Sequence, residues 1–115
     1  MRSEPVARGD VWQVDFGQTR GHEQSGVRPG LIISADIFNQ GASGLVIAVP
    51  ITTKHKRIST HVRIDPPEGG LDETSYAKSE EVRSISKERL LRYRGRASAP
   101  TLRAVGSRIA DLLEL

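Results

Sequence analysis

The sequence predicts a single small domain that is mainly β-structure and ends in one α-helix. Through residues 10–97, apolar residues alternate with polar ones or form short runs rich in Val, Ile and Leu, which is typical of strands. Residues 98–115 change to an apolar repeat of three to four, which is typical of a helix. No internal repeat or linker divides the 115 residues, so we expect one domain over residues 1–115, built as a small twisted antiparallel sheet or barrel.

Two long apolar runs are expected to form the centre of the sheet. Residues 30–38 (GLIISADIF) and 44–53 (GLVIAVPITT) are apolar enough to be strands buried on both faces. Residues 10–16 (DVWQVDF) alternate instead, with Trp12 expected in the core. Shorter strands are expected at residues 61–64, 76–78, 81–85 and 92–97, and one helical turn capped by Ser86 at residues 86–91.

The terminal helix is expected to cover one side of the sheet. Ser98 or Thr101 can cap its first turn, where Pro100 is tolerated because the first amide groups of a helix lack partners. Gly106 lies inside the helix and costs about 1 kcal/mol relative to Ala unless a close contact requires it. The expected apolar face consists of Leu102, Val105, Ile109, Leu112 and Leu113.

Composition narrows the classes of protein and of site. The absence of Cys excludes disulfides and thiolate metal sites, and His22, His55 and His61 show no metal-ligand spacing, so we expect neither metal nor cofactor. No apolar run approaches the roughly 20 residues of a membrane span, and the N-terminus lacks an apolar signal segment. We therefore expect a soluble cytoplasmic protein. A net charge of +3 is compatible with an anionic partner such as nucleic acid, although many soluble domains are basic for no specific reason.

Polar residues gather at the ends of three expected strands. In GHEQSGVRP, Arg28 directly precedes Pro29, which biases its backbone towards extended geometry. VPITT leads into a basic tip at residues 54–57, and KSEEVR mixes both signs of charge. Taken singly, each has a plainer interpretation: Arg28 pairs with Glu23 or Asp15 on the surface, and the basic tip is a solvated hairpin. The order of the three segments along one chain favours a shared site.

This order resembles the MazF/PemK (Kid) toxins of bacterial toxin–antitoxin systems. The matching segments are RGDVWQVDF, GHEQSGVRPGLIIS, VPITT and VRSI, and the resemblance extends from Arg8 to the terminal helix. It implies an SH3-like barrel of the MazF/CcdB/Kid type, usually a homodimer. It also implies a metal-independent, sequence-specific endoribonuclease that cleaves single-stranded RNA to 2′,3′-cyclic phosphate and 5′-OH ends and so arrests translation and growth. The implied partner is a cognate MazE-like antitoxin with an acidic disordered tail.

The resemblance also assigns residues to roles. Arg28 matches the catalytic arginine and Thr52 the threonine beside it. The positions of proton transfer fall on His22, Glu80 and Lys78, where Glu80 replaces the usual Asp and Lys78 an arginine. Substrate contacts are implied for Glu23, Gln24, Thr53, Lys54, Glu81 and Arg83.

Two alternatives from other functional classes share this fold. One is a CcdB-like toxin that binds DNA gyrase and cuts nothing, and the other is an RNA-binding SH3-like module. Arg28 within GxEQxGxRP favours the nuclease, and cleavage of RNA by the purified protein decides between them.

Overall fold

The structure is a computed structural model that describes residues 5–115. Its α-helices are α1 (Asp36–Asn39) and α2 (Ala99–Leu113), and three 3₁₀ turns are η1 (Glu68–Gly70), η2 (Ser79–Glu81) and η3 (Lys87–Arg89). None of the helices among the described residues is long and apolar enough to cross a membrane. The strands are β1 (Asp10–Asp15), β2 (Val27–Ile32), β3 (Leu45–Thr52), β4 (His61–Ile64), β5 (Ser75–Lys78), β6 (Arg83–Ser86) and β7 (Leu90–Arg96).

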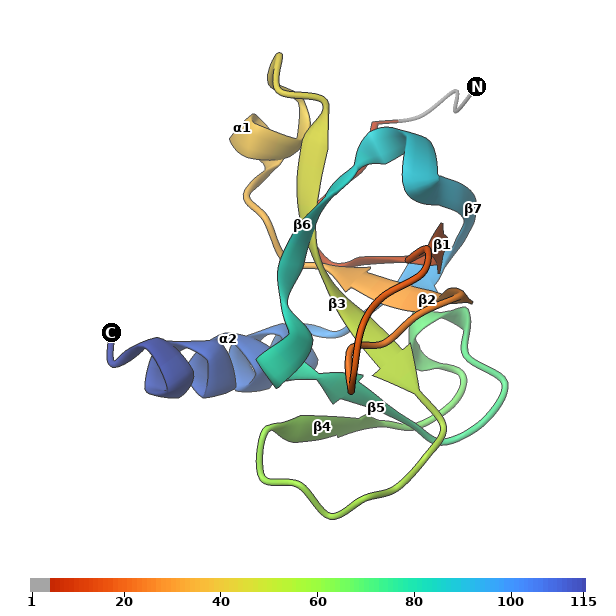
Figure 1. The fold of residues 1–115 in the computed structure, drawn as a ribbon, viewed down its shortest axis with the longest axis vertical. Coiled ribbons are helices and arrows are strands. Elements are labelled where there is room, and N and C mark those ends of the chain that lie inside the picture. The colour runs from red at the N-terminus through yellow and green to blue at the C-terminus, as the bar shows by residue number, and fades with distance from the viewer. Residues whose placement is uncertain (1–4) are drawn as a thin grey trace.

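The strands form one antiparallel sheet in the order β4-β5-β3-β2-β1-β7, and β6 pairs with β3 beside this path. The long strand β3 has β2 on one edge, while β6 and then β5 share the other edge on either side of the η2 turn. In Figure 1 the sheet bends sharply, so that β1 and β2 run across the direction of β3. The two ends of the path, β4 and β7, do not pair. The expected barrel-like fold with a C-terminal helix is confirmed, as an open rather than a closed barrel.

Each face of the sheet has its own apolar cluster. Because neighbouring side chains point to opposite faces of a strand, Val11 and Trp12 belong to different clusters. Helix α2 covers the second cluster, in which Val105 is fully buried. The first cluster holds Val6, Trp12, Val14, Phe16, Ile32, Val46, Ala48, Ile85 and Leu90, and the second holds Val11, Leu31, Val49, Ile51, Ile64, Leu71, Ala77, Ala97 and Val105.

The predicted caps are confirmed, whereas the predicted apolar face of α2 is too long. Ser98 accepts a hydrogen bond from the Thr101 amide, and Ser86 caps η3 by accepting one from the Glu88 amide. Leu112 and Leu113 are 47% and 61% exposed. The last turns of α2 project past the edge of the sheet in Figure 1, so these leucines have no strand to pack against.

The strand predicted at residues 30–38 is wrong at both ends. The observed strand β2 begins at Val27, where pairing with β1 starts, and ends at Ile32. The buried side chains of Ser34 and Asn39 hydrogen-bond each other, and Asn39 Nδ2 also donates to the Ser34 carbonyl at 2.9 Å. These local bonds compete with strand pairing and turn the chain into α1.

The strand predicted at residues 81–85 is shifted. Glu81 belongs to the η2 turn, and the strand β6 runs over Arg83–Ser86. The turn lets one continuous segment pair with β3 twice, first as β5 and then as β6. It also places the carboxylate of Glu81 next to the loop that joins β1 and β2, because that carboxylate accepts a hydrogen bond from the Gln24 amide.

Candidate active site

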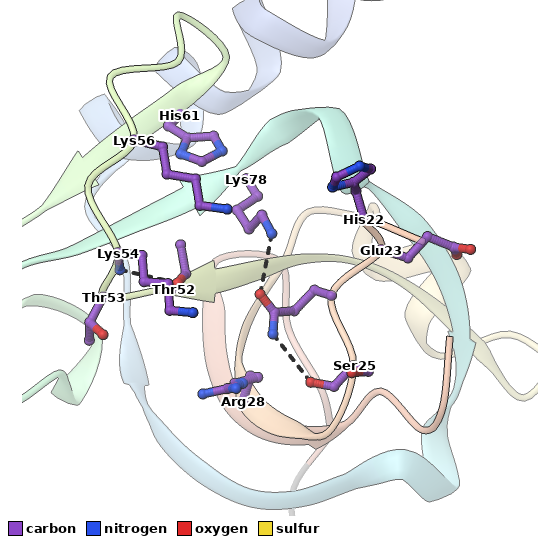
Figure 2. Close-up of a pocket in the computed structure, with 11 residues that line it drawn as sticks. His22, Glu23, Ser25, Arg28, Thr52, Thr53, Lys54, Lys56, His61 and Lys78 are labelled. Atoms are coloured by element: carbon purple, nitrogen blue, oxygen red, sulfur yellow. Dashed lines mark hydrogen bonds between the residues drawn. The ribbon is translucent and has the colours of Figure 1, made fainter. Parts of the chain in front are cut away.

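A polar hollow of about 220 Å³ lies where the loop between β1 and β2 meets the ends of β3 and β5 (Figure 2). It brings together the three polar segments singled out in the sequence. Eleven residues line it: His22, Glu23, Gln24, Ser25, Arg28, Thr52, Thr53, Lys54, Lys56, His61 and Lys78. Of the residues predicted for the site, Glu80, Glu81 and Arg83 do not line the hollow.

Arg28 and Thr52 both line the hollow, from the two central strands β2 and β3. The pairing of these strands runs from Gly30–Pro50 to Ile32–Ala48. Arg28 and Thr52 each lie two residues beyond the Gly30–Pro50 pair, where the hollow begins.

Arg28 is exposed, and its guanidinium makes no hydrogen bond or ion pair with any residue from 5 to 115. The surface pairs considered from the sequence do not form. Asp15 accepts a hydrogen bond from the Gly17 amide at 2.8 Å, and Glu23 lies 3.8 Å from Arg83. The guanidinium is therefore available to an anion in the hollow.

The Thr52 hydroxyl is oriented by the backbone. Its oxygen accepts a hydrogen bond from the Lys54 amide at 3.1 Å. That bond uses a lone pair and leaves the hydroxyl proton free to donate to a ligand. Thr53, Lys54 and Lys56 also line the hollow, and the two lysines belong to the basic tip expected from the sequence.

Lys78 lies at the end of β5 with only 8% of its surface exposed. Its Nζ is 2.7 Å from the Glu81 carboxylate and donates to Gln24 Oε1 at 3.2 Å (Figure 2 shows the second contact). The opposite charge of Glu81 offsets that of Lys78. A carboxylate beside the hollow is thus compensated by the lysine rather than facing a ligand alone.

Glu80 is directed at His61 instead of at the hollow. Its carboxylate accepts from the Thr60 hydroxyl at 2.7 Å and lies 2.9 Å from His61 Nε2. Partial burial raises the pKa of Glu80, but the hydrogen bonds from Thr60, the backbone and His61 outweigh burial and hold the pKa below its usual value. Glu80 is therefore an ionised partner of His61 at neutral pH.

His61 lines the hollow and was missed by the sequence reasoning. Its side chain is only 3% exposed, and its Nδ1 atom is buried with no hydrogen-bond partner among residues 5–115. His61 is the cross-strand partner of Lys78 in the β4–β5 pair, so the two side chains lie on the same face. Pairing the expected strands at residues 61–64 and 76–78 in this register would have pointed to His61.

Arg83 supports the loop between β1 and β2. Its guanidinium stacks 4.7 Å from the centre of the Phe16 ring. One nitrogen donates to the carbonyls of both Phe16 and Gln24 at 3.2 Å. These bonds join the start of the loop to its end.

The hollow is rich in positive charge, with Arg28, Lys54, Lys56 and Lys78 against Glu23. This arrangement suits a phosphate group, which accepts several charge-assisted hydrogen bonds at once. Among residues 5–115, no three His, Asp or Glu side chains gather as a metal site requires.

Residues 7–113 match the family described as the PemK-like, MazF-like toxin of type II toxin–antitoxin systems. The chain belongs to this family. The resemblance inferred from GHEQSGVRP and VPITT is thereby confirmed over nearly the whole chain.

The chain is similar to two curated proteins that are named endoribonucleases. The chain is 36% identical over 102 residues to endoribonuclease MazF9 of Mycobacterium tuberculosis, covering 84% of this chain and 86% of the relative. It is 38% identical over 86 residues to endoribonuclease EndoA of Bacillus subtilis, covering 74% of each.

Solved structures of PemK/MazF-like proteins share the fold. A crystal structure of MazF from Deinococcus radiodurans superposes with a TM-score of 0.87 at 26% identity, covering 98% of this chain and all of that one. An endoribonuclease from a mycobacterial species, in complex with its cognate antitoxin, gives a TM-score of 0.79 at 28% identity and 96% coverage of both chains.

Proposed function

We propose that this chain is the toxin of a type II toxin–antitoxin system and cleaves single-stranded RNA without a metal ion. The observation that carries the proposal is the free guanidinium of Arg28, which lines a cationic hollow together with Thr52. Similarity to two proteins named endoribonucleases supports it.

The reaction needs a stabilised phosphorane. The ribose 2′-oxygen attacks the adjacent phosphorus, negative charge builds on the equatorial oxygens, and the 5′-oxygen leaves. A guanidinium stays charged and forms two parallel hydrogen bonds to phosphate oxygens, so Arg28 binds this charge. Thr52 donates its free hydroxyl proton to the same group. The products are a 2′,3′-cyclic phosphate and a 5′-OH.

Proton transfer to the leaving 5′-oxygen falls to His22 in this proposal. His22 is exposed on the loop between β1 and β2 and lines the same hollow as Arg28 (Figure 2). An imidazole can change its protonation near neutral pH. Lys78 is less suited to this step because Glu81 holds it, and Glu80 because it faces His61.

Recognition of the RNA rests mainly on hydrogen bonds from the loops. Trp12 and Tyr76 are buried, and His55 stacks on the Tyr76 ring with centroids 4.6 Å apart. Gln24, Thr53 and Lys54 line the hollow and are proposed to contact bases and phosphates of an unpaired strand, whose base edges are open to hydrogen bonding.

A cognate antitoxin with an acidic segment is the proposed protein partner. A disordered acidic chain that folds on binding complements the cationic hollow and would exclude RNA from it. The antitoxin complex of the similar mycobacterial endoribonuclease supports this proposal. We also propose that the toxin is a homodimer that acts on RNA in the cytoplasm.

The direct test incubates the purified chain with a long single-stranded RNA in the presence of EDTA and maps the ends produced. We expect specific cuts that carry 5′-OH and 2′,3′-cyclic phosphate ends. Intact RNA would favour a gyrase-binding toxin or a bare RNA-binding module, and activity that EDTA abolishes would require a metal-dependent nuclease.

A further inference from the structure

We infer that His61, held by Glu80, is the base that removes the proton from the ribose 2′-OH. The inference rests on the proposed ribonuclease function and assigns a residue outside the sequence-predicted site. Its starting point is the buried Nδ1 atom of His61, which has no hydrogen-bond partner among the described residues although the side chain lines the hollow.

The tautomer of His61 follows from its partner. A carboxylate can only accept hydrogen bonds, so the 2.9 Å contact with Glu80 places the proton of a neutral imidazole on Nε2. Nδ1 then carries the free lone pair. Thr60 donates to the other oxygen of Glu80 at 2.7 Å and fixes the carboxylate, which in turn fixes the imidazole ring. A carboxylate that orients a histidine in this way is a recurring arrangement of general bases.

A buried nitrogen without a hydrogen-bond partner destabilises the fold. A ligand hydroxyl that donates to Nδ1 would remove this penalty, and the 2′-OH of RNA is such a donor. Lys56 lines the same hollow, is exposed and makes no hydrogen bond or ion pair with residues 5–115. Its side chain can move aside when RNA enters.

The imidazole lies among charged groups of both signs. The Glu80 carboxylate contacts the imidazole. The positive charge of Lys78, which lies opposite His61 on β5, is offset by Glu81. The charged groups of the packed elements are Glu80 and Glu81 from η2, Lys78 from β5, Lys56 from the preceding loop, and Arg108 and Asp111 of α2, which lie beside Ser59 and Thr60.

The reaction balances with two histidines. The 2′-OH proton passes to His61 Nδ1 while the bond from O2′ to phosphorus forms. The bond from phosphorus to O5′ breaks, and the leaving O5′ takes a proton from protonated His22. Exchange with water then restores both imidazoles. Glu80 touches neither substrate nor reacting atoms and is a positioning residue.

The test measures the pH dependence of kcat/KM for His61→Gln, Glu80→Gln and the matched control His55→Gln. His55 does not line the hollow. We expect His61→Gln to lower kcat/KM by about 10²–10⁴-fold and to lose the acidic limb of the pH profile. Glu80→Gln should lower it about tenfold and move that limb to lower pH, because the carboxylate no longer favours the imidazolium. His55→Gln should match the wild type.

Binding of a 2′-deoxy oligonucleotide, which cannot be cleaved, should be unchanged in all three variants. If His61→Gln keeps the wild-type rate and pH profile, the assignment is wrong. If His61→Gln does not fold, an unshifted acidic limb in Glu80→Gln overturns the inference instead. Failure of the wild type to cleave RNA would overturn the proposed function itself. Wild-type cleavage by His61→Gln would overturn only this inference.

Discussion

Arg28 lies in the part of β2 that pairs with β1 but not with β3. Its backbone pairs with Val14 of β1, but the pairing of β2 with β3 covers only Gly30–Ile32. The following residue, Pro29, has no amide proton to leave unpaired at this open edge. The geometry explains why an extended strand can present an unpaired arginine to solvent. Since no protein partner must be displaced, the guanidinium is ready to bind phosphate.

Glu80 gives a pH-dependent contribution to stability whose sign follows from its hydrogen bonds. Its folded pKa lies below the ordinary 4.5, so its contribution is complete above about pH 4.5 and is lost as the pH falls through the folded pKa. We predict that Glu80→Gln lowers the free energy of unfolding at pH 7 and that the difference from wild type shrinks towards pH 3. Urea unfolding at several pH values measures it.

The control is Glu88→Gln, because Glu88 is exposed and its carboxylate has no partner within residues 5–115. A Glu80→Gln effect that is the same at pH 7 and pH 3 would contradict the assigned role of the carboxylate.

At the scale of elements, the η2 turn and the first residue of β6 hold the loop between β1 and β2 in place. The Glu81 carboxylate accepts from the Gln24 amide, and Arg83 donates to the Gln24 carbonyl. The peptide groups on both sides of Gln24 are thus held by two residues that the sequence analysis had placed on the substrate. Glu81 and Arg83 do not line the hollow themselves. They contact the loop that forms one of its walls.

We predict that Glu81→Ala loosens this loop. Loss of the bond to the Gln24 amide should speed its hydrogen exchange by about tenfold, as expected for one hydrogen bond of about 1.4 kcal/mol. Exchange measured by NMR over residues 18–26, with Glu88→Ala as control, tests this. Equal protection of the Gln24 amide in both variants would show that Glu81 does not anchor the loop.

Helix α2 contains Gly106, and no close contact with other parts of the fold requires a glycine at this position. A methyl group at Gly106 would meet no atom within 4 Å, and the residue is exposed. We predict that Gly106→Ala stabilises the protein by about 1 kcal/mol through higher helix propensity. Chemical denaturation should show a higher midpoint with an unchanged slope. An unchanged or lower midpoint would contradict this prediction.

The strands and caps were predictable because they depend on neighbours in sequence. Alternation located β1, and serine caps located η3 and α2. Helix α1 was missed because two side chains, Ser34 and Asn39, override an apolar run. Arg28 and Thr52 were found through family resemblance. Glu80 bonds His61 19 residues away, and Glu81 and Arg83 bond Gln24 57 and 59 residues away, so these contacts depend on the tertiary fold.

At the scale of the whole molecule, both faces of the sheet carry an apolar cluster, and one face also carries the polar hollow. One face is covered by α2, while the other carries an apolar cluster that gives way to the polar hollow at the ends of β2, β3 and β5. Most of the hollow's charge is positive. Binding of RNA should therefore be driven in large part by release of counterions from the strand.

We predict a logarithmic salt slope of about −2 for binding of a 2′-deoxy single strand, since three cations, Arg28, Lys54 and Lys56, can each neutralise one phosphate at about −0.7 per contact. Replacing both lysines by Ala should reduce the slope to about −0.7. Arg103→Ala on the exposed side of α2 should leave it unchanged. A salt slope that stays the same when both lysines are replaced would show that the RNA does not bind in the hollow.

The most direct measurement of the central claim is the cleavage rate of Arg28→Ala beside that of Arg92→Ala, an exposed arginine without partners among the described residues. We predict that Arg28→Ala loses at least about 10²–10³-fold in kcat, because it removes the main stabiliser of the phosphorane, while its circular dichroism and melting temperature match the wild type. Arg92→Ala should cleave normally. Cleavage by Arg28→Ala at the wild-type rate would show that Arg28 does not stabilise the transition state.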